Sequence, residues 1–184
     1  MYRVKGTIQG VAPILFNRMT DEAETALDAG TTGGKYSQDE RMQEALLKVH
    51  RSPTTGGLCI TSWMFKRVMQ EGSKKAVLKE GRLGFADLMM ATVFVDGELL
   101  FGKDDPDFIH TEWGRKPPRT GGACIIKRPA LSIGWELPFQ LVVTDDRRPE
   151  AYLRRALEEG GMLAGLGSHR PEYGRFIVTD WERL

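Results

Sequence analysis

The period of the apolar residues changes along this chain in an order that few folds accept. Residues 2–9 alternate apolar or small side chains with polar ones, which is the period of a half-buried strand. Further on, Thr61 or Ser62 is placed to cap a helix, because either hydroxyl can accept from free backbone N–H groups of the first turn. The predicted inward face of this helix holds Phe65, Val68 and Met69.

The second half of the chain repeats this change of period. Residues 89–97 predict a strand that ends in a turn, and residues 98–101 predict the returning arm of a hairpin. Residues 133–145 predict a long strand, residues 149–161 predict a helix that begins at a proline, and residues 175–184 alternate into a last strand. The inward face of the second helix is predicted to hold Leu153, Ala156 and Leu157.

The predicted order is therefore β, α, β, β, α, β within a single domain of residues 1–184. This order is typical of an α+β fold of the ferredoxin-like, RRM-like type, which contains a split βαβ unit. Two insertions remain, one after the first strand over residues 17–57 and one between the middle strands over residues 102–130. The topology alone predicts no chemistry, because it serves many unrelated functions.

The two insertions differ in character. In the first, Ser37 and Glu40 have capping-box spacing ahead of an apolar helical face, so a helix is expected there. The second has little apolar periodicity and is rich in Pro, Gly and basic residues, which predicts a protruding loop or ribbon. Its residues 115–128 hold five cations and no acidic residue, although the whole chain has a net charge of only +1. This stretch is either a contact for nucleic acid or a solvated face.

A glycine-rich stretch, AGLGSHRPEYGRF, occupies residues 164–176 between the second helix and the last strand. Gly165, Gly167 and Gly174 allow backbone angles and close approaches that a Cβ would forbid. Two interpretations follow from the residues. Either the backbone of this glycine loop lies directly against a ligand, or the stretch is a long turn that joins two elements.

In its order of glycines, a basic residue, an aromatic residue and a final Gly-Arg, this stretch resembles the glycine-rich loop of the RAMP superfamily, the RNA-binding subunits of CRISPR effector complexes. That loop commonly follows G-x-G-x-x-R-x-x-G-[FY]-G-R. The chain departs from it at Ser168, where a glycine is often found, and at Pro171, which adds rigidity. Residues 10–19, GVAPILFNRM, are similar to a pattern in uncharacterised phage proteins, so a phage-encoded relative is one interpretation.

The resemblance implies an RRM-like domain that binds single-stranded RNA, or DNA, and lines up copies along the strand. The basic insertion would correspond to a thumb that reaches across the strand, and its cations would neutralise phosphates beside backbone amides of the glycine loop. Trp113, Tyr173 or Phe176 would stack on bases, with core packing as the alternative for each ring. The predicted nucleic-acid-binding residues are Arg115, Lys116, Arg119, Lys127, Arg128, Gly165, Gly167, His169, Arg170, Tyr173, Gly174 and Arg175.

Catalytic chemistry has fewer candidates. The three histidines show no metal-ligand spacing with one another or with the cysteines, so neither a metal nor a cofactor is predicted. In the repeat-processing branch of the same superfamily, a histidine serves as general acid or base in metal-independent RNA cleavage. His50 and His169 are the candidate catalytic residues on this resemblance. A surface histidine at a helix end is the simpler interpretation of His50.

The composition indicates the cellular compartment in which the protein is expected. No apolar run approaches the roughly 18 residues of a membrane span, and the chain starts on a strand-like pattern rather than a signal peptide. Cys59 and Cys124 match no disulfide framework, so a cytoplasmic protein without a membrane partner is expected. Three function classes stay open: a non-catalytic RNA-binding subunit in a homo-oligomer or multi-subunit complex, a metal-independent endoribonuclease, and a phage structural or assembly protein.

Overall fold

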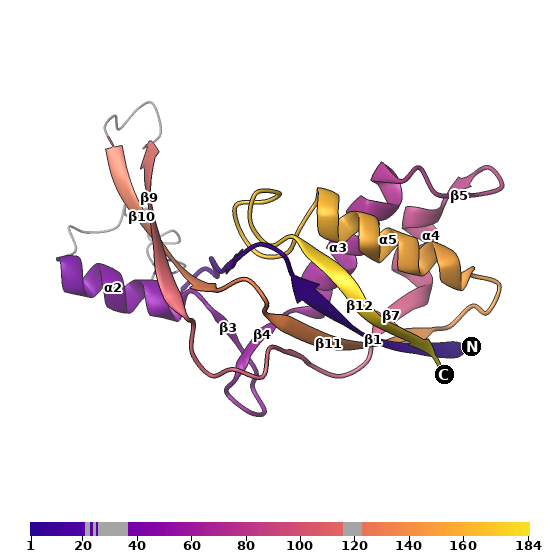
Figure 1. Cartoon of the computed structure of the whole chain (residues 1–184), viewed down its shortest axis with the longest axis horizontal. Helices are drawn as coiled ribbons and strands as arrows, with labels where there is room; N and C mark the ends of the chain where they lie inside the picture. Colours follow the sequence, from indigo (N-terminus) through magenta and orange to yellow (C-terminus); the bar gives the residue numbers. More distant parts are fainter. Residues whose placement is uncertain (21–22, 24, 26–36, 116–122) are drawn as a thin grey trace.

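The computed structural model describes residues 1–20, 23, 25, 37–115 and 123–184. Helices and antiparallel strands are combined in it, which confirms the predicted α+β class (Figure 1). Within these described ranges, no helix has both the length and the apolar character that crossing a membrane requires.

The largest sheet has four strands in the order β12-β1-β11-β7. These are β12 (Phe176–Arg183), β1 (Tyr2–Gly10), β11 (Glu136–Val143) and β7 (Val93–Val95). Every neighbouring pair is antiparallel. The alternation predicted for the first strand is confirmed, because Tyr2, Val4 and Ile8 are buried in the core while the polar residues that alternate with them are more exposed.

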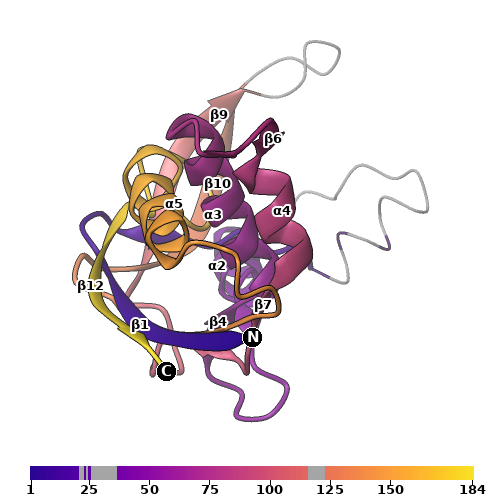
Figure 2. The same ribbon diagram turned by 90° about the vertical axis from the view of Figure 1, so that its right-hand side faces the viewer.

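Helices α3 (Ser62–Lys75), α4 (Phe85–Thr92) and α5 (Glu150–Leu163) lie together on one side of this sheet (Figure 2). The predicted cap of α3 is confirmed at Thr61, whose hydroxyl accepts from the backbone N–H of Met64. Both predicted inward faces are confirmed, since the following side chains are buried: Phe65, Val68, Met69, Leu153, Ala156 and Leu157. The two longest of these helices pack closely because Gly72 and Gly160 bring their backbones together, where a Cβ on either glycine would collide with the other helix.

Two predictions about the middle of the chain are wrong. The strand predicted over residues 89–97 is only three residues long, and Met89 belongs to α4, because Phe85 and Met89 form a buried helical face one turn apart. Residues 98–101 do not return along β7. Their strand β8 (Leu99–Leu100) pairs instead with β4 (Leu58–Ile60), which in turn pairs with β3 (His50–Arg51).

A long ribbon leaves the body of the molecule (Figure 1). It consists of β9 (Phe108–Arg115) and β10 (Ala123–Leu131), which pair antiparallel, and we call it the hairpin. The short strand β2 (Ile14–Leu15) pairs with the base of β10. Helix α2 (Gln38–Leu47) lies beside this base, and the capping box predicted for Ser37 and Glu40 is confirmed.

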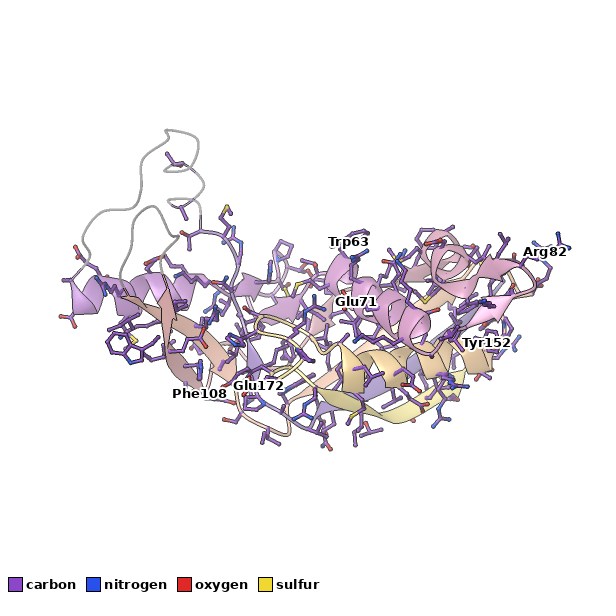
Figure 3. All side chains as sticks on the ribbon, turned by 90° about the horizontal axis from the view of Figure 1, so that it is seen from above. Trp63, Glu71, Arg82, Phe108, Tyr152 and Glu172 are labelled. Carbon is purple, nitrogen blue, oxygen red and sulfur yellow. The ribbon has the colours of Figure 1, made fainter. Side chains whose placement is uncertain are left out.

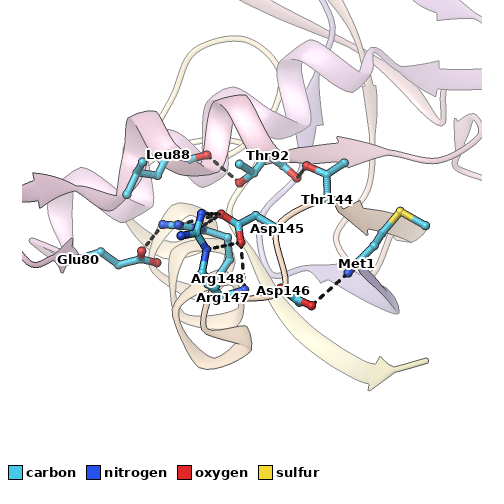
Figure 4. Close-up of polar contacts among 9 residues, drawn as sticks. All are labelled: Met1, Glu80, Leu88, Thr92, Thr144, Asp145, Asp146, Arg147 and Arg148. Carbon is cyan, nitrogen blue, oxygen red and sulfur yellow. Dashed lines mark hydrogen bonds and ion pairs between the residues drawn. The ribbon is translucent and has the colours of Figure 1, made fainter.

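A buried arginine fixes the turn that leads into α5 (Figure 4). Arg148 is 9% exposed, and its guanidinium donates to Asp145 at 2.9 Å and to Glu80. Its carbonyl oxygen accepts from the Tyr2 hydroxyl at 2.9 Å. Glu80 belongs to β5 (Lys79–Glu80), which pairs with β6 (Leu83–Gly84), so Arg148 ties this short arm to the main sheet.

Candidate nucleic-acid interface

The glycine loop adopts the backbone angles that its composition predicts. Gly165, Gly167 and Gly174 have φ values of +74°, +78° and +75°, a region that an L side chain rarely occupies. His169, at φ +60°, adopts a similar angle despite its side chain. The loop therefore makes a tight, defined path between α5 and β12, and this path brings the side chains of His169 and Tyr173 against the hairpin.

The close approaches in the glycine loop are made to the protein's own backbone. Ser168 donates its N–H to the carbonyl of Leu15, and Gly174 donates to the carbonyl of Pro13, both at 2.8 Å. A Cβ on Gly167 would collide with the Leu15 carbonyl. The loop is thus docked on residues 11–15, so the two stretches that carry sequence resemblances lie side by side.

A cluster of polar side chains joins the glycine loop to the hairpin, and Glu112 of β9 is at its centre. One carboxylate oxygen accepts from Arg128 of β10 and lies 3.2 Å from His169 Nδ1. The other oxygen lies 3.6 Å from His110 Nε2. The Tyr173 ring packs against both imidazoles, with centroid distances of 5.1 Å to His110 and 5.7 Å to His169. We call these five side chains the junction cluster.

The charged neighbours of Glu112 in the junction cluster determine the direction in which the pKa of its carboxyl is shifted. Burial by itself would raise the pKa of the Glu112 carboxyl. The hydrogen bond and charge of Arg128, with smaller contributions from His169 and His110, outweigh burial and hold this pKa below its usual value. Arg128 is only 12% exposed, and its Nε has no hydrogen-bond partner among the described residues. Among the described residues, Glu112 is therefore the ion-pair partner of this nearly buried guanidinium.

The two faces of the hairpin separate the basic residues that the sequence grouped together. Because side chains alternate along a strand, Arg128 faces the glycine loop, whereas Lys127 lies opposite Thr111 on the other face. Trp113 lies on the same outer face as Lys127 and is 78% exposed. The side chain of Arg115, and all of Lys116 and Arg119, lie outside the described residues.

The loop arginines have different surroundings. Arg170 donates to the carbonyl of Gly165 at 3.3 Å and lies 3.5 Å from the Glu71 carboxylate of α3. Arg175 has an exposed side chain, while its carbonyl accepts from the N–H groups of Val11 and Ala12. Both guanidinium groups remain within reach of solvent.

The three aromatic candidates for base stacking differ in how far their rings are exposed to solvent. Phe176 is fully buried, with its ring centroid 6.2 Å from that of Trp135, so core packing, the alternative to stacking, is confirmed for this ring. Tyr173 is half-buried between the two imidazoles of the junction cluster. Trp113 is the stacking candidate whose ring is open to solvent.

The two candidate catalytic histidines lie in different environments. His50 belongs to β3, opposite Cys59 of β4. Burial, with a smaller contribution from the charge of Arg18, lowers the pKa of this imidazole below its usual value. His169 belongs to the junction cluster. Within the described ranges, no group of three or more His, Cys, Asp or Glu side chains is arranged to hold a metal ion.

Sequence reasoning missed His110 and Glu112 as members of this site. Their spacing of two residues places them on one face of a strand, and this spacing is the feature of the sequence that could have indicated a joint role. The sequence does not set the register of a ribbon in this segment, and the loop partners His169 and Tyr173 lie about 60 residues away in the chain.

No family model matches the sequence, and no curated protein is significantly similar to it. Among solved structures, the chain is similar to one chain of the "Cryo-EM structure of the Type III-B Cmr-beta bound to cognate target RNA". The TM-score is 0.65 at 12% sequence identity, and the match covers 100% of this chain and 60% of that one. The chain thus shares the fold of a part of that neighbour.

Proposed function

We propose that this chain is a non-catalytic subunit that binds single-stranded nucleic acid, with RNA as its ligand. The observation that carries the proposal is that the glycine loop and the hairpin lie against each other through the junction cluster. These two segments contain the cations, aromatic rings and glycines that predict nucleic-acid binding. Residues that are far apart in the sequence thereby meet at the inner face of the hairpin, and Lys127 and Trp113 lie on its outer face.

The fold supports this proposal. The strand order β12-β1-β11-β7, with α3 leading from β1 toward β7 and α5 leading from β11 to β12, is the order expected of a ferredoxin-like domain. The similar fold of a chain in an RNA-bound complex supports the same assignment. The resemblance of the glycine loop to that of the RAMP superfamily rests on different observations and points to the same ligand.

The protein holds the single-stranded nucleic acid by contacts of its cations with phosphates and by stacking of an aromatic ring on a base. Lys127 and Trp113 share the outer face of the hairpin, so a phosphate and a base can be contacted from the same ribbon. The predicted cations Arg115, Lys116 and Arg119 lie between Trp113 and Lys127 in the sequence, and we propose that they add positive charge to this contact. Arg175 adds an exposed cation on the glycine loop.

The subunit works in an assembly that follows the strand, either as a homo-oligomer or within a multi-subunit complex. Supporting this proposal, the structural neighbour is a chain of a complex bound to target RNA. The main sheet also ends in β12 and β7, which pair with no further strand among the described residues, and an unpaired edge can add a strand of another chain. Light scattering should report an oligomer whose mass increases with the length of the added oligonucleotide. A monomer under both conditions contradicts this part of the proposal.

The binding proposal is tested by fluorescence anisotropy on a labelled single-stranded RNA at several salt concentrations. Arg115→Glu combined with Arg119→Glu should weaken binding and reduce the salt dependence by up to about two units of slope. The matched control is Lys74→Glu combined with Lys75→Glu in the last turn of α3, which changes the net charge equally. If the two double variants behave alike, neither Arg115 nor Arg119 contacts a phosphate, and this part of the proposal is wrong.

The junction cluster also favours a second candidate function, metal-independent RNA cleavage. Its two imidazoles can act as base and acid: one accepts the proton of the 2′-hydroxyl as that oxygen attacks phosphorus, and the other donates a proton to the leaving 5′-oxygen. The products are a 2′,3′-cyclic phosphate and a 5′-hydroxyl. Incubation of labelled RNA with EDTA distinguishes the two functions, since a binding subunit leaves the RNA intact. Cleavage abolished by His169→Ala but not by His50→Ala would establish the catalytic candidate.

The third class, a structural or assembly protein, makes a different prediction. Such a protein purified at low salt should show an A260/A280 ratio that nuclease treatment leaves unchanged. Copurified nucleic acid that nuclease removes would instead support the binding subunit.

A further inference from the structure

An exposed indole lies at the start of α3, away from the junction cluster. Trp63 is in the first turn of this helix and is 62% exposed (Figure 3). One turn later, the guanidinium of Arg67 lies 5.7 Å from the centre of the Trp63 ring and covers one of its faces. A large ring that is neither packed in the core nor covered on both faces exposes apolar surface that a ligand can bury.

A cavity of about 220 Å³ opens beside this indole, between α3 and the glycine loop. From α3 it is lined by Trp63, Met64, Arg67, Val68 and Glu71, and from the loop by Leu166, Gly167 and Arg170. This volume is below the range of about 300–1,000 Å³ that is typical of pockets for drug-sized ligands. It therefore suits one planar ring better than a whole cofactor.

The charges around the cavity favour an anionic ligand. Two guanidinium groups, those of Arg67 and Arg170, and one carboxylate, that of Glu71, line the cavity. Arg170 lies 3.5 Å from this carboxylate and also bonds the Gly165 carbonyl, so its position is set by both walls of the cavity. Arg67 donates to the Gln70 amide oxygen. The cations are held in place beside the ring rather than free on long side chains.

We propose that this Trp63 pocket takes one base of the bound strand, with the base stacked on the indole and the adjacent phosphates beside Arg67 and Arg170. The inference rests on the proposed single-strand binding and adds a specific base site to it. A base is the occupant that matches both properties of the site, because it is a flat ring attached to an anionic backbone. The glycine loop forms one wall of the pocket, so the site is continuous with the proposed binding surface.

The test compares wild type with Trp63→Ala and Trp63→Phe on a labelled single-stranded RNA and on the same strand with abasic positions. Trp63→Ala should weaken binding to the intact strand by about 5- to 150-fold, the usual effect of losing one stacking ring. Trp63→Phe should retain most of the affinity. On the abasic strand, wild type and Trp63→Ala should bind equally, because the base that the ring contacts is missing.

Phe94→Ala is the matched control. Phe94 is also an exposed ring, 48% exposed, with a cation over it, Lys66, but it does not line this cavity. Its removal should leave affinity unchanged. Trp63 lies on the surface, so its variants should keep the melting temperature of wild type, which circular dichroism verifies.

The possible outcomes separate this inference from the proposed function. Equal binding of wild type and Trp63→Ala to the intact strand overturns the base site and leaves the proposed function standing. Failure of wild type to bind any single strand overturns both. Loss of an oligomer by Trp63→Ala without added RNA, with unchanged affinity per chain, shows that Trp63 contacts a second copy and also overturns the base site.

Discussion

His169 Nδ1 lies 3.2 Å from Oε1 of Glu112, and this contact joins the glycine loop to the hairpin. The same carboxylate oxygen accepts from Arg128, so this one oxygen contacts both His169 of the glycine loop and Arg128 of the hairpin. Arg128 therefore has a structural partner within the protein. The lysine next to it, on the opposite face of β10, is the side chain left for a ligand.

We expect Glu112→Gln to lower the free energy of unfolding by about 1–3 kcal/mol, because it leaves the nearly buried Arg128 guanidinium without its charged partner. Urea unfolding followed by circular dichroism measures this loss. The control is a double-mutant cycle with Arg128→Gln. The double variant should be less destabilised than the sum of the two single variants, and simple additivity would show that the pair is not coupled.

The docking of the glycine loop can be tested by comparing Gly167 with a control glycine outside the loop, Gly56. The two have similar backbone angles and differ in whether a Cβ would collide with the protein. Gly167 and Gly56 have φ values of +78° and +76°, but a Cβ on Gly167 meets the Leu15 carbonyl, whereas a Cβ on Gly56 meets nothing within 4 Å. We expect Gly56→Ala to cost about 1 kcal/mol for the backbone angle alone. Gly167→Ala should cost about 2–4 kcal/mol, since the collision adds to the angle. Equal melting temperatures would mean that the loop moves away from residues 11–15 at little cost.

The half-buried His50 makes stability depend on pH. Its pKa is lower in the folded chain, so the unfolded chain binds the proton more readily. The contribution of His50 to stability is fully present above about pH 6.5 and is lost as the pH falls from there through the folded-state pKa. Urea unfolding between pH 7.5 and 5.5 should therefore show a smaller decline for His50→Gln than for wild type. Parallel declines in the two proteins would contradict the assignment.

Substitution of Arg170 tests nucleic-acid binding with little effect on stability. Its ion pair with Glu71 involves side chains that are 35% and 30% exposed, so Arg170→Ala should change stability by about 0–1 kcal/mol. Affinity for a single strand should fall, with the salt slope reduced by about one unit if the guanidinium contacts a phosphate. Arg154→Ala is the control, because Arg154 is an exposed cation on α5 that pairs only with Glu158 one turn away among the described residues. Wild-type affinity in Arg170→Ala would remove this residue from the interface.

The sequence by itself determined the α+β class, the capping residues and the buried faces of the two long helices. Each of these depends on interactions within a few residues. The alternation of Val4 and Ile8, the hydroxyl of Thr61 and the spacing of Phe65 and Met69 act through local geometry, so a pattern reports them directly.

Tertiary structure alone decided the site. The sequence could not show that Phe176 is buried against Trp135, or that Lys127 and Arg128 face opposite ways on the hairpin. Nor could it show that β8 pairs with β4, or that His169 meets Glu112. These contacts join residues tens of positions apart, and they form because burying apolar surface and pairing strands across the whole chain selects among many locally acceptable arrangements.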